Sequence, residues 1–263
     1  MSLEYIRLWK RYLGACAALG DTGLSRLPIG ANATDHDHVN SFLAKLHLFP
    51  VPRSARHIVD VGANIGVFAQ AAALYCPSAE IIALEPSAST FAKLEKRVGP
   101  RILCRKAAVG TASGTATLHI AENAFSSTLR APSESCKNLY GNAVSPTGAT
   151  EEVPVVTLAQ IIEEYSLPHI DLLKVDVEGF EPQVLAGAGE YLVSHVQRLT
   201  LEASVARLTF RGVLEMLQSL EQLGFVVVNI VDVSRALHLP NGPVSQFDVD
   251  LINPVLASSA ASP

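Results

Sequence analysis

The sequence has few cysteines, and the four it has are widely spaced. They stand at positions 16, 76, 104 and 136 of 263 residues, and none belongs to a C-x-x-C pair. This spacing excludes a zinc ribbon and a dithiol redox motif. Scattered thiols suit a reducing compartment, so we expect a cytoplasmic protein.

Basic charge and long apolar runs are also missing. The formal net charge is −5, and no Lys/Arg-rich block interrupts the chain, which disfavours a protein that grips nucleic acid through its phosphates. No apolar run reaches the roughly 18 residues that a membrane span needs. The short apolar stretch 12–20 faintly resembles a signal peptide. Apolar residues before it recur at helical spacing, however, and favour an N-terminal amphipathic helix. We expect neither a nucleic acid nor a membrane partner.

The chain instead contains strands that alternate with helices. This alternation predicts an α/β fold with a mostly parallel sheet covered on both faces. The last two strands follow one another without a clear helix and are expected to pair antiparallel. The predicted strands cover residues 57–61, 80–84, 101–108, 170–175, 196–202, 225–231 and 247–252.

The pattern predicts one domain with additions. Residues 1–50 form an N-terminal extension, with a loop at 20–40 and a short helix at 39–48, and this extension is a possible substrate lid. Residues 51–255 form the main domain. An insertion at 111–156 is rich in small polar residues and predicts a β-hairpin or flap. Residues 256–263 are expected to be a disordered tail.

The most informative segment is the glycine loop at 57–67. An apolar strand ends in a turn with Gly62 and Gly66, and an amphipathic helix follows. This layout lets backbone N–H groups approach a nucleotide-like ligand. Asn64 stands where a dinucleotide fingerprint has its second glycine, the residue that lets a pyrophosphate approach. The loop therefore favours an adenosine cofactor without a pyrophosphate.

An acid follows the next strand at the position expected for a ribose contact. Glu85 comes nineteen residues after Gly66 and directly follows residues 80–84, so its carboxylate can accept both ribose hydroxyls. Two other classes remain open. A nicotinamide-dependent oxidoreductase is disfavoured by Asn64, and a binding module without catalysis is disfavoured by the intact acidic positions.

A second group of acids follows strand 170–175. The string 174–181 reads KVDVEGFE, and Asp176 stands at the carboxyl end of the strand, where ligands bind in open α/β sheets. Asp176 is expected to face the cofactor or the substrate. For Glu178 and Glu181 the alternative is that they flank the following helix, where acids interact well with its dipole.

These segments together resemble the FkbM-type methyltransferases. The resemblance is carried by DVGANIG at 60–66, Glu85-Pro86, the string 173–181 and LTLE at 199–202, and it spans roughly residues 55–205. It implies a class I methyltransferase fold, with a seven-stranded, mostly parallel sheet and an antiparallel last strand. It also implies S-adenosylmethionine as methyl donor and, most often, O-methylation of a small molecule or a sugar-derived natural product.

The resemblance also assigns roles to particular residues. Glu85 would take the ribose hydroxyls, and Asp176 and Glu178 would lie near the transferred methyl group. Ser126 and Ser127, in the insertion, would meet cofactor or substrate. The methionine side of the cofactor would be lined by Asp60, Gly62, Asn64 and Gly66.

A hydroxyl acceptor gains from a base, whereas a carboxylate acceptor needs none. Candidate bases are Asp176, Glu178, and His38 or His36 from the run 35–38, which is otherwise a solvated polar loop. Substrate contacts are expected from His36, Ser126, Ser127 and Glu181. We expect a small-molecule acceptor, no metal, and a monomer or homodimer. A divalent ion held by the histidines with Asp176, Glu178 and Glu202 is the minority alternative.

Overall fold

The computed structural model of the chain describes residues 33–49, 51–121, 127–130, 146–235 and 244–259. The predicted N-terminal amphipathic helix lies outside these ranges. So does most of the predicted 20–40 loop. Within the described ranges, the helices are too short or too polar to cross a lipid bilayer.

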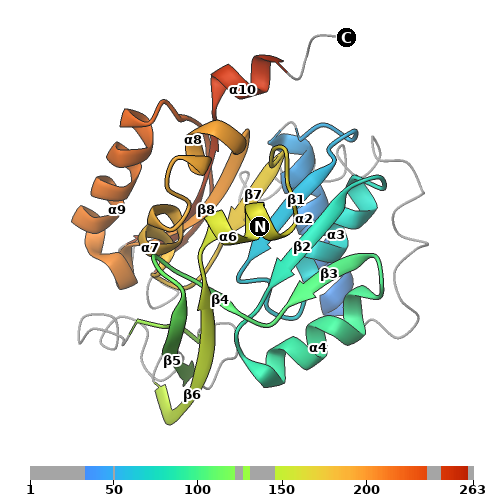
Figure 1. Cartoon of the computed structure of the whole chain (residues 1–263). Coiled ribbons are helices and arrows are strands. Elements are labelled where there is room, and N and C mark those ends of the chain that lie inside the picture. The colour runs from blue at the N-terminus through green and yellow to red at the C-terminus, as the bar shows by residue number, and fades with distance from the viewer. Residues whose placement is uncertain (1–32, 50, 122–126, 131–145, 236–243, 260–263) are drawn as a thin grey trace, which may run out of the picture.

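A central seven-stranded sheet has the strand order β3-β2-β1-β7-β8-β10-β9 (Figure 1). The first five of these strands run parallel to one another. Strand β10 runs antiparallel to both β8 and β9, which confirms the predicted fold class and the antiparallel last pair. The bounds are β1 His57–Val61, β2 Glu80–Leu84, β3 Ile102–Arg105, β7 Leu172–Val175, β8 Arg198–Ser204, β9 Val226–Arg235 and β10 Val244–Ile252.

Because successive side chains of a strand point to opposite faces of the sheet, they pack into two separate hydrophobic cores. In β1, Ile58 packs with helices α2 (Ala33–Leu48), α3 (Val67–Tyr75) and α4 (Ala88–Val98). Its neighbours Val59 and Val61 pack on the opposite face. The helices on that face are α6 (Leu158–Glu164), α7 (Glu181–Ala186), α8 (Tyr191–His195) and α9 (Val205–Gln222). Both faces of the sheet are therefore covered, as the apolar strands require.

The insertion forms a second, three-stranded sheet of order β4-β6-β5. Strand β5 (Gly114–Ala121) pairs antiparallel with β6 (Pro146–Val156), and β6 pairs parallel with β4 (Ala108–Val109). Figure 1 shows this hairpin projecting beyond the main sheet. The predicted hairpin is confirmed, although β6 begins well before the expected residue 153.

Three helical segments differ from the prediction. Helix α2 begins at Ala33 and not at 39, so the polar run 35–38 is helical and not a loop. Helix α8 had no clear pattern in the sequence. The expected disorder from residue 256 is wrong as far as 259, because helix α10 covers Pro254–Ser259.

Candidate active site

Two cavities open at the carboxyl edge of the sheet. The glycine-loop cavity has a volume of about 260 Å³ and lies among the ends of β1, β2 and β7 and the insertion. The sheet-face cavity has a volume of about 410 Å³ and lies between α2 and the face of β7, β8, β10 and β9. Three residues line both cavities and mark where they meet: Asp176, Glu202 and Gln246.

The glycine loop is shaped by left-handed backbone conformations. Gly62 has φ +79°, and a Cβ atom there would overlap the carbonyl oxygen of Asp176. Asn64 has φ +50°, and its side-chain oxygen accepts a hydrogen bond from the Ile65 N–H at 2.7 Å. Gly62 and Asn64 both line the glycine-loop cavity. The loop therefore brings bare backbone and one short amide to the ligand space.

Gly66 is required for helix packing, whereas Gly62 lines the ligand space. It precedes helix α3 with φ +84°, and a Cβ atom there would come within 2.6 Å of Leu94 and Val98 on α4. Gly66 is not among the residues that line either cavity. It permits the close packing of α3 on α4, which holds the loop in place.

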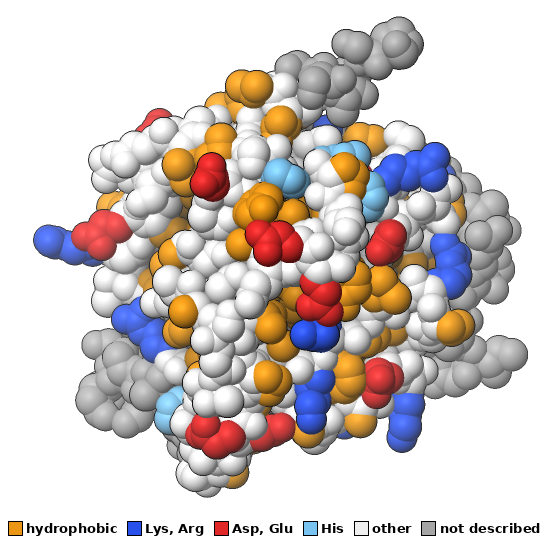
Figure 2. Space-filling model, in the orientation of Figure 1, with side chains coloured by type: hydrophobic (Ala, Val, Ile, Leu, Met, Phe, Trp, Pro, Cys, Tyr) orange, Lys and Arg blue, Asp and Glu red, His pale blue; other side chains and the backbone are white. Residues whose placement is uncertain are grey.

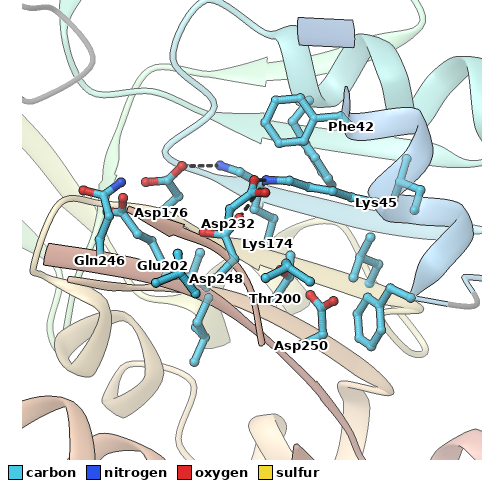
Figure 3. A pocket seen from close by; sticks show the side chains of 18 of the residues that line it. Phe42, Lys45, Lys174, Asp176, Thr200, Glu202, Asp232, Gln246, Asp248 and Asp250 are labelled. Atoms are coloured by element: carbon cyan, nitrogen blue, oxygen red, sulfur yellow. Dashed lines mark hydrogen bonds and ion pairs between the residues drawn. The ribbon is translucent and has the colours of Figure 1, made fainter. Parts of the chain in front are cut away.

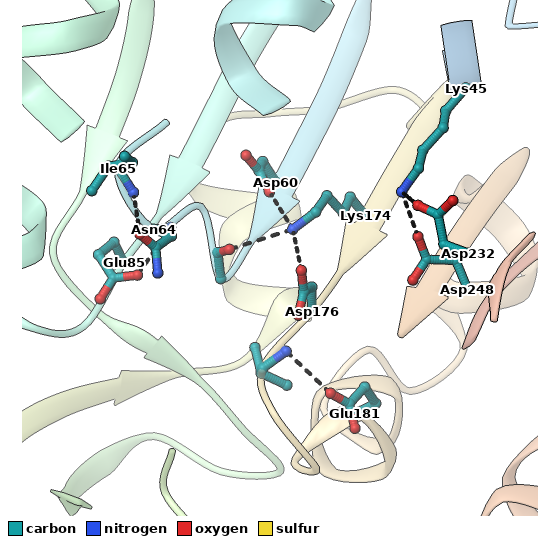
Figure 4. Close-up of polar contacts among 12 residues, drawn as sticks. Lys45, Asp60, Asn64, Ile65, Glu85, Lys174, Asp176, Glu181, Asp232 and Asp248 are labelled. Carbon is teal, nitrogen blue, oxygen red and sulfur yellow. Dashed lines mark hydrogen bonds and ion pairs between the residues drawn. The ribbon is translucent and has the colours of Figure 1, made fainter. Parts of the chain in front are cut away.

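Glu85 lies beside the loop, as predicted. Its Oε2 accepts a hydrogen bond from the Asn64 N–H at 3.1 Å (Figure 4), and its Oε1 accepts one from the Ser87 N–H at 3.0 Å. Burial raises the pKa of Glu85 to about 7, although the two N–H donors oppose the rise. The carboxylate lines the glycine-loop cavity and joins the loop after β1 to the loop after β2.

A buried lysine links two acids beneath the loop. Lys174 Nζ lies 3.3 Å from Asp60 Oδ1 and 3.2 Å from Asp176 Oδ2 (Figure 4). Asp60 and Lys174 are register partners in β1 and β7, so their side chains share one face. Burial lowers the pKa of Lys174, but Asp176 and Asp60 outweigh it, and the pKa rises. Asp60 is fully buried and lines neither cavity, so it supports Lys174 and Asp176 from below.

Glu178 is paired with an arginine that sequence reasoning missed. Both Nε and Nη2 of Arg207 lie 3.1 Å from Glu178 Oε2. Burial raises the pKa of Glu178 although Arg207 opposes the rise. Glu178 lines the glycine-loop cavity, and its backbone carbonyl accepts a hydrogen bond from Thr128 Oγ1 at 2.9 Å. The pairing with Arg207 in α9 gave no periodic signal in the sequence.

Glu181 lies apart from the cavities. Its side chain is fully buried, and its Oε1 accepts hydrogen bonds from the Val177 and Gly179 N–H groups at 3.1 Å each. Burial raises the pKa of Glu181 to about 7, and these N–H groups oppose the rise. Its contacts match the alternative in which this acid stabilises the loop before α7, and not the predicted substrate contact.

The floor of the sheet-face cavity is polar because of strand alternation. Thr200 and Glu202 of β8 lie opposite Asp250 and Asp248 of β10, and all four line the cavity (Figure 3). Burial, and then repulsion from Glu178 and Asp176, raises the pKa of Glu202 well above its usual range. Alternating polar residues in a central strand are unusual, and LTLEA at 199–203 was a signal for this floor.

Helix α2 forms the opposite wall. Lys45 Nζ lies 2.7 Å from Asp248 Oδ2 and also pairs with Asp232 of β9. The rings of Phe42, Phe49 and Phe68 line the same cavity. Figure 3 shows Phe42 and Lys45 above the acids of the sheet. The cavity thus combines an aromatic wall with a carboxylate floor.

Of the remaining predicted residues, one lines a cavity, one lies away from both cavities, and two have side chains that the structure does not describe. Ser127 lines the glycine-loop cavity, and its Oγ accepts a hydrogen bond from the Ala121 N–H at 3.3 Å. Ser126 lies outside the described residues, and so does the side chain of His36. His38 is exposed on α2 and lines neither cavity, so its predicted role as base has no support in this geometry.

Two characterised methyltransferases are similar to this chain. Methyltransferase sdnD of Sordaria araneosa is 32% identical over 185 residues, which cover 60% of this chain and 71% of that protein. The 31-O-demethyl-FK506 methyltransferase FkbM of Streptomyces tacrolimicus is 31% identical over 195 residues, covering 62% and 74%.

A solved structure of methyltransferase FkbM from Methylobacillus flagellatus KT has 15% identity and a TM-score of 0.45. It covers 91% of this chain and 59% of that chain, and the score is too low to support an inference by itself. The Methyltransferase FkbM domain matches residues 60–227, more than half of the chain. This match decides for a methyltransferase over the oxidoreductase and the binding module. The chain belongs to the FkbM methyltransferase family.

Proposed function

We propose that this enzyme transfers a methyl group from S-adenosylmethionine to an oxygen atom of a small-molecule acceptor. The donor would occupy the glycine-loop cavity, and the acceptor would occupy the sheet-face cavity. The observation that carries the proposal is the junction of the two cavities at Asp176, Glu202 and Gln246. A methyl donor and its acceptor have to meet in line at one point.

The residues of the glycine-loop cavity fit this cofactor. The backbone at Gly62 has no space for a side chain, Asn64 replaces the glycine that a pyrophosphate needs, and Glu85 offers its carboxylate beside the loop. When bound, S-adenosylmethionine supplies a methyl group on a cationic sulfur. The acids at the junction favour a cationic ligand, because three carboxylates gather there, those of Asp176, Glu178 and Glu202. Among the described residues, the basic side chains that form ion pairs with them are Lys174 and Arg207.

The sheet-face cavity supports an acceptor with both apolar and hydroxylated parts. Aromatic rings on α2 and α3 can pack on a carbon skeleton, and the carboxylates of Glu202, Asp248 and Asp250 can accept hydrogen bonds from hydroxyl groups. The relative from Streptomyces tacrolimicus is named for O-methylation, which agrees with an oxygen acceptor here.

Asp176 is the proposed base for a hydroxyl acceptor. It lines both cavities, and Lys174 holds one of its oxygen atoms. The Asp176→Asn variant keeps the shape of the side chain and removes its ability to take a proton. We expect kcat to fall by about 10²- to 10⁴-fold, while affinity for S-adenosylmethionine changes by a few-fold. An unchanged kcat would exclude Asp176 as the base.

Among the described residues on the face of the protein in Figure 2, no continuous basic surface of the kind that nucleic acids need is present. Figure 2 shows Lys and Arg side chains dispersed over the visible face, with acids between them. Together with the net charge of −5, this supports a small molecule over a polyanion.

The test is methyl transfer from S-adenosylmethionine with an isotopically labelled methyl group. A panel of acceptors with matched skeletons would carry a hydroxyl, a carboxyl or an amine, and mass spectrometry with NMR would locate the label. We expect a methyl ether or ester. Labelling of the amines alone would overturn the proposal for oxygen.

A further inference from the structure

Three carboxylates converge where the two cavities meet. Asp176 and Glu178 stand in the loop after β7, and Glu202 stands in the neighbouring strand β8. One oxygen atom of each lies within 4.8 Å of those of the other two. Figure 3 shows Asp176 and Glu202 side by side at one end of the sheet-face cavity. The donor set therefore consists of oxygen atoms from two adjacent strand ends.

Two of the three carboxylates form ion pairs with basic side chains. Lys174 approaches Asp176 at Oδ2, and Arg207 approaches Glu178 at Oε2 with both Nε and Nη2. A carboxylate has two oxygen atoms and about four lone pairs, so one that is held at a single oxygen can still coordinate a cation. The two ion pairs fix the orientation of the carboxylates in the way that supporting contacts orient metal ligands.

Glu202 supplies the independent indication of a ligand. The residue is 7% exposed, and its Oε2 is buried without a hydrogen-bond partner among the described residues. The residue lines both cavities, and one of its carboxylate oxygens lies within 4.8 Å of an oxygen of Asp176 and of Glu178, so the carboxylate group points to the junction. A buried carboxylate oxygen without a donor is costly unless something else neutralises it.

We propose that Asp176, Glu178 and Glu202 bind a divalent cation at the junction of the cavities. An all-oxygen set suits a hard cation. Calcium binds oxygen at about 2.3–2.6 Å, so two ligands on opposite sides lie up to about 5 Å apart. Magnesium, at about 2.0–2.1 Å, needs its opposite ligands about 4 Å apart. The three oxygen atoms, within 4.8 Å of one another, lie close to these separations, and side-chain rotations would bring them to the bond lengths of either ion.

The role of such an ion in the reaction rests on the proposed function, in which donor and acceptor meet at the junction. A cation at the junction would contact an acceptor oxygen in the sheet-face cavity, lower the pKa of its hydroxyl and hold it toward the donor. The proton would pass to Asp176 or to solvent. His38 of the minority alternative is not part of this set, because it is exposed and lines neither cavity. The side chain of His36 lies outside the described residues.

The test is manganese binding by the full chain after treatment with a chelator, in the absence of S-adenosylmethionine. Electron paramagnetic resonance reports free Mn²⁺ directly. We expect one bound ion per chain in the native protein and at least tenfold weaker binding in the Glu202→Gln variant. The Asp250→Asn variant removes an acid from the same cavity floor but outside the cluster, so its affinity should stay within twofold.

Two results would overturn the site: no binding by the native chain at millimolar Mn²⁺, or equal binding by Glu202→Gln with its circular dichroism unchanged. If Glu202→Gln failed to fold, Asp176→Asn would take its place with the same expectation. Calorimetry with S-adenosylmethionine on the chelated protein separates the two proposals. Cofactor binding without Mn²⁺ binding removes the metal and leaves the proposed function, whereas Mn²⁺ binding without cofactor binding does the reverse.

Discussion

Glu85 holds the glycine loop and is also proposed to bind the cofactor, and substitutions at this position can separate the two roles. Its carboxylate accepts hydrogen bonds from Asn64 and Ser87 and is proposed to accept ribose hydroxyls as well. The Glu85→Ala variant should weaken S-adenosylmethionine binding by about 1.5–3 kcal/mol for each lost hydrogen bond to a charged group. Calorimetry measures the affinity directly. The Glu85→Gln variant, which keeps one acceptor for the loop, should lose less, and equal affinity in all three proteins would refute the ribose contact.

Glu181 makes stability depend on pH. Its pKa is about 7 in the folded chain and about 4.5 in the unfolded chain, so the folded state binds the proton more tightly. This contribution to stability is present below pH 4.5 and is lost as pH rises through 7. In Glu181→Gln, the amide oxygen can still accept from Val177 and Gly179. Its free energy of unfolding should therefore fall less between pH 5 and 7.5.

The difference between the two proteins should be at most about 3 kcal/mol. Chemical denaturation at several pH values measures it. Parallel curves for the native chain and Glu181→Gln over this window would show that the buried carboxyl does not take up a proton.

At the scale of elements, the glycine loop depends on close packing and not only on a left-handed backbone. Gly62 has φ +79° and no space for a Cβ atom, whereas Gly99 has φ +67° and open space around it. Gly99→Ala thus reports the conformational cost alone, on the order of 1–3 kcal/mol. Gly62→Ala should be destabilised by clearly more and should lose cofactor binding. Equal loss of melting temperature in both variants would contradict the packing account.

Helix α2 is held to the sheet by Lys45, which pairs with Asp248 and Asp232. Lys45→Met keeps the apolar stem and leaves two acids without their cation. Backbone amides of α2 should then exchange hydrogen at least several-fold faster, while affinity for S-adenosylmethionine is kept. Lys96→Met, on the exposed face of α4, is the matched control. Unchanged exchange in α2 would show that the aromatic contacts alone hold the helix.

Elements with strong periodic signals were predicted with the right bounds. Strands β1 and β2 were placed at 57–61 and 80–84, where the structure has them. The start of α2 was missed because its first turns are polar and carry no apolar stripe. Helices α8 and α10, with five and six residues, are too short for a period to be read.

At the scale of the whole molecule, the site residues that sequence spacing predicted are those that directly follow a strand. Gly62, Asn64 and Glu85 follow consecutive strands and could be read from spacing. Arg207 meets Glu178, and Lys45 meets Asp248, only because the order β7-β8-β10-β9 in the sheet and the packing of α2 and α9 on its two faces bring them together. Side-chain pairs between distant elements leave no trace in one sequence, so neither pair was predicted.

The central claim is that the glycine-loop cavity takes S-adenosylmethionine and delivers its methyl group to the junction at Asp176 and Glu202. Isothermal titration calorimetry of the native chain with S-adenosylmethionine, and separately with NAD, tests it most directly. We predict one binding site for S-adenosylmethionine and no heat of binding with NAD. Binding of NAD alone, or of neither compound, would contradict the account.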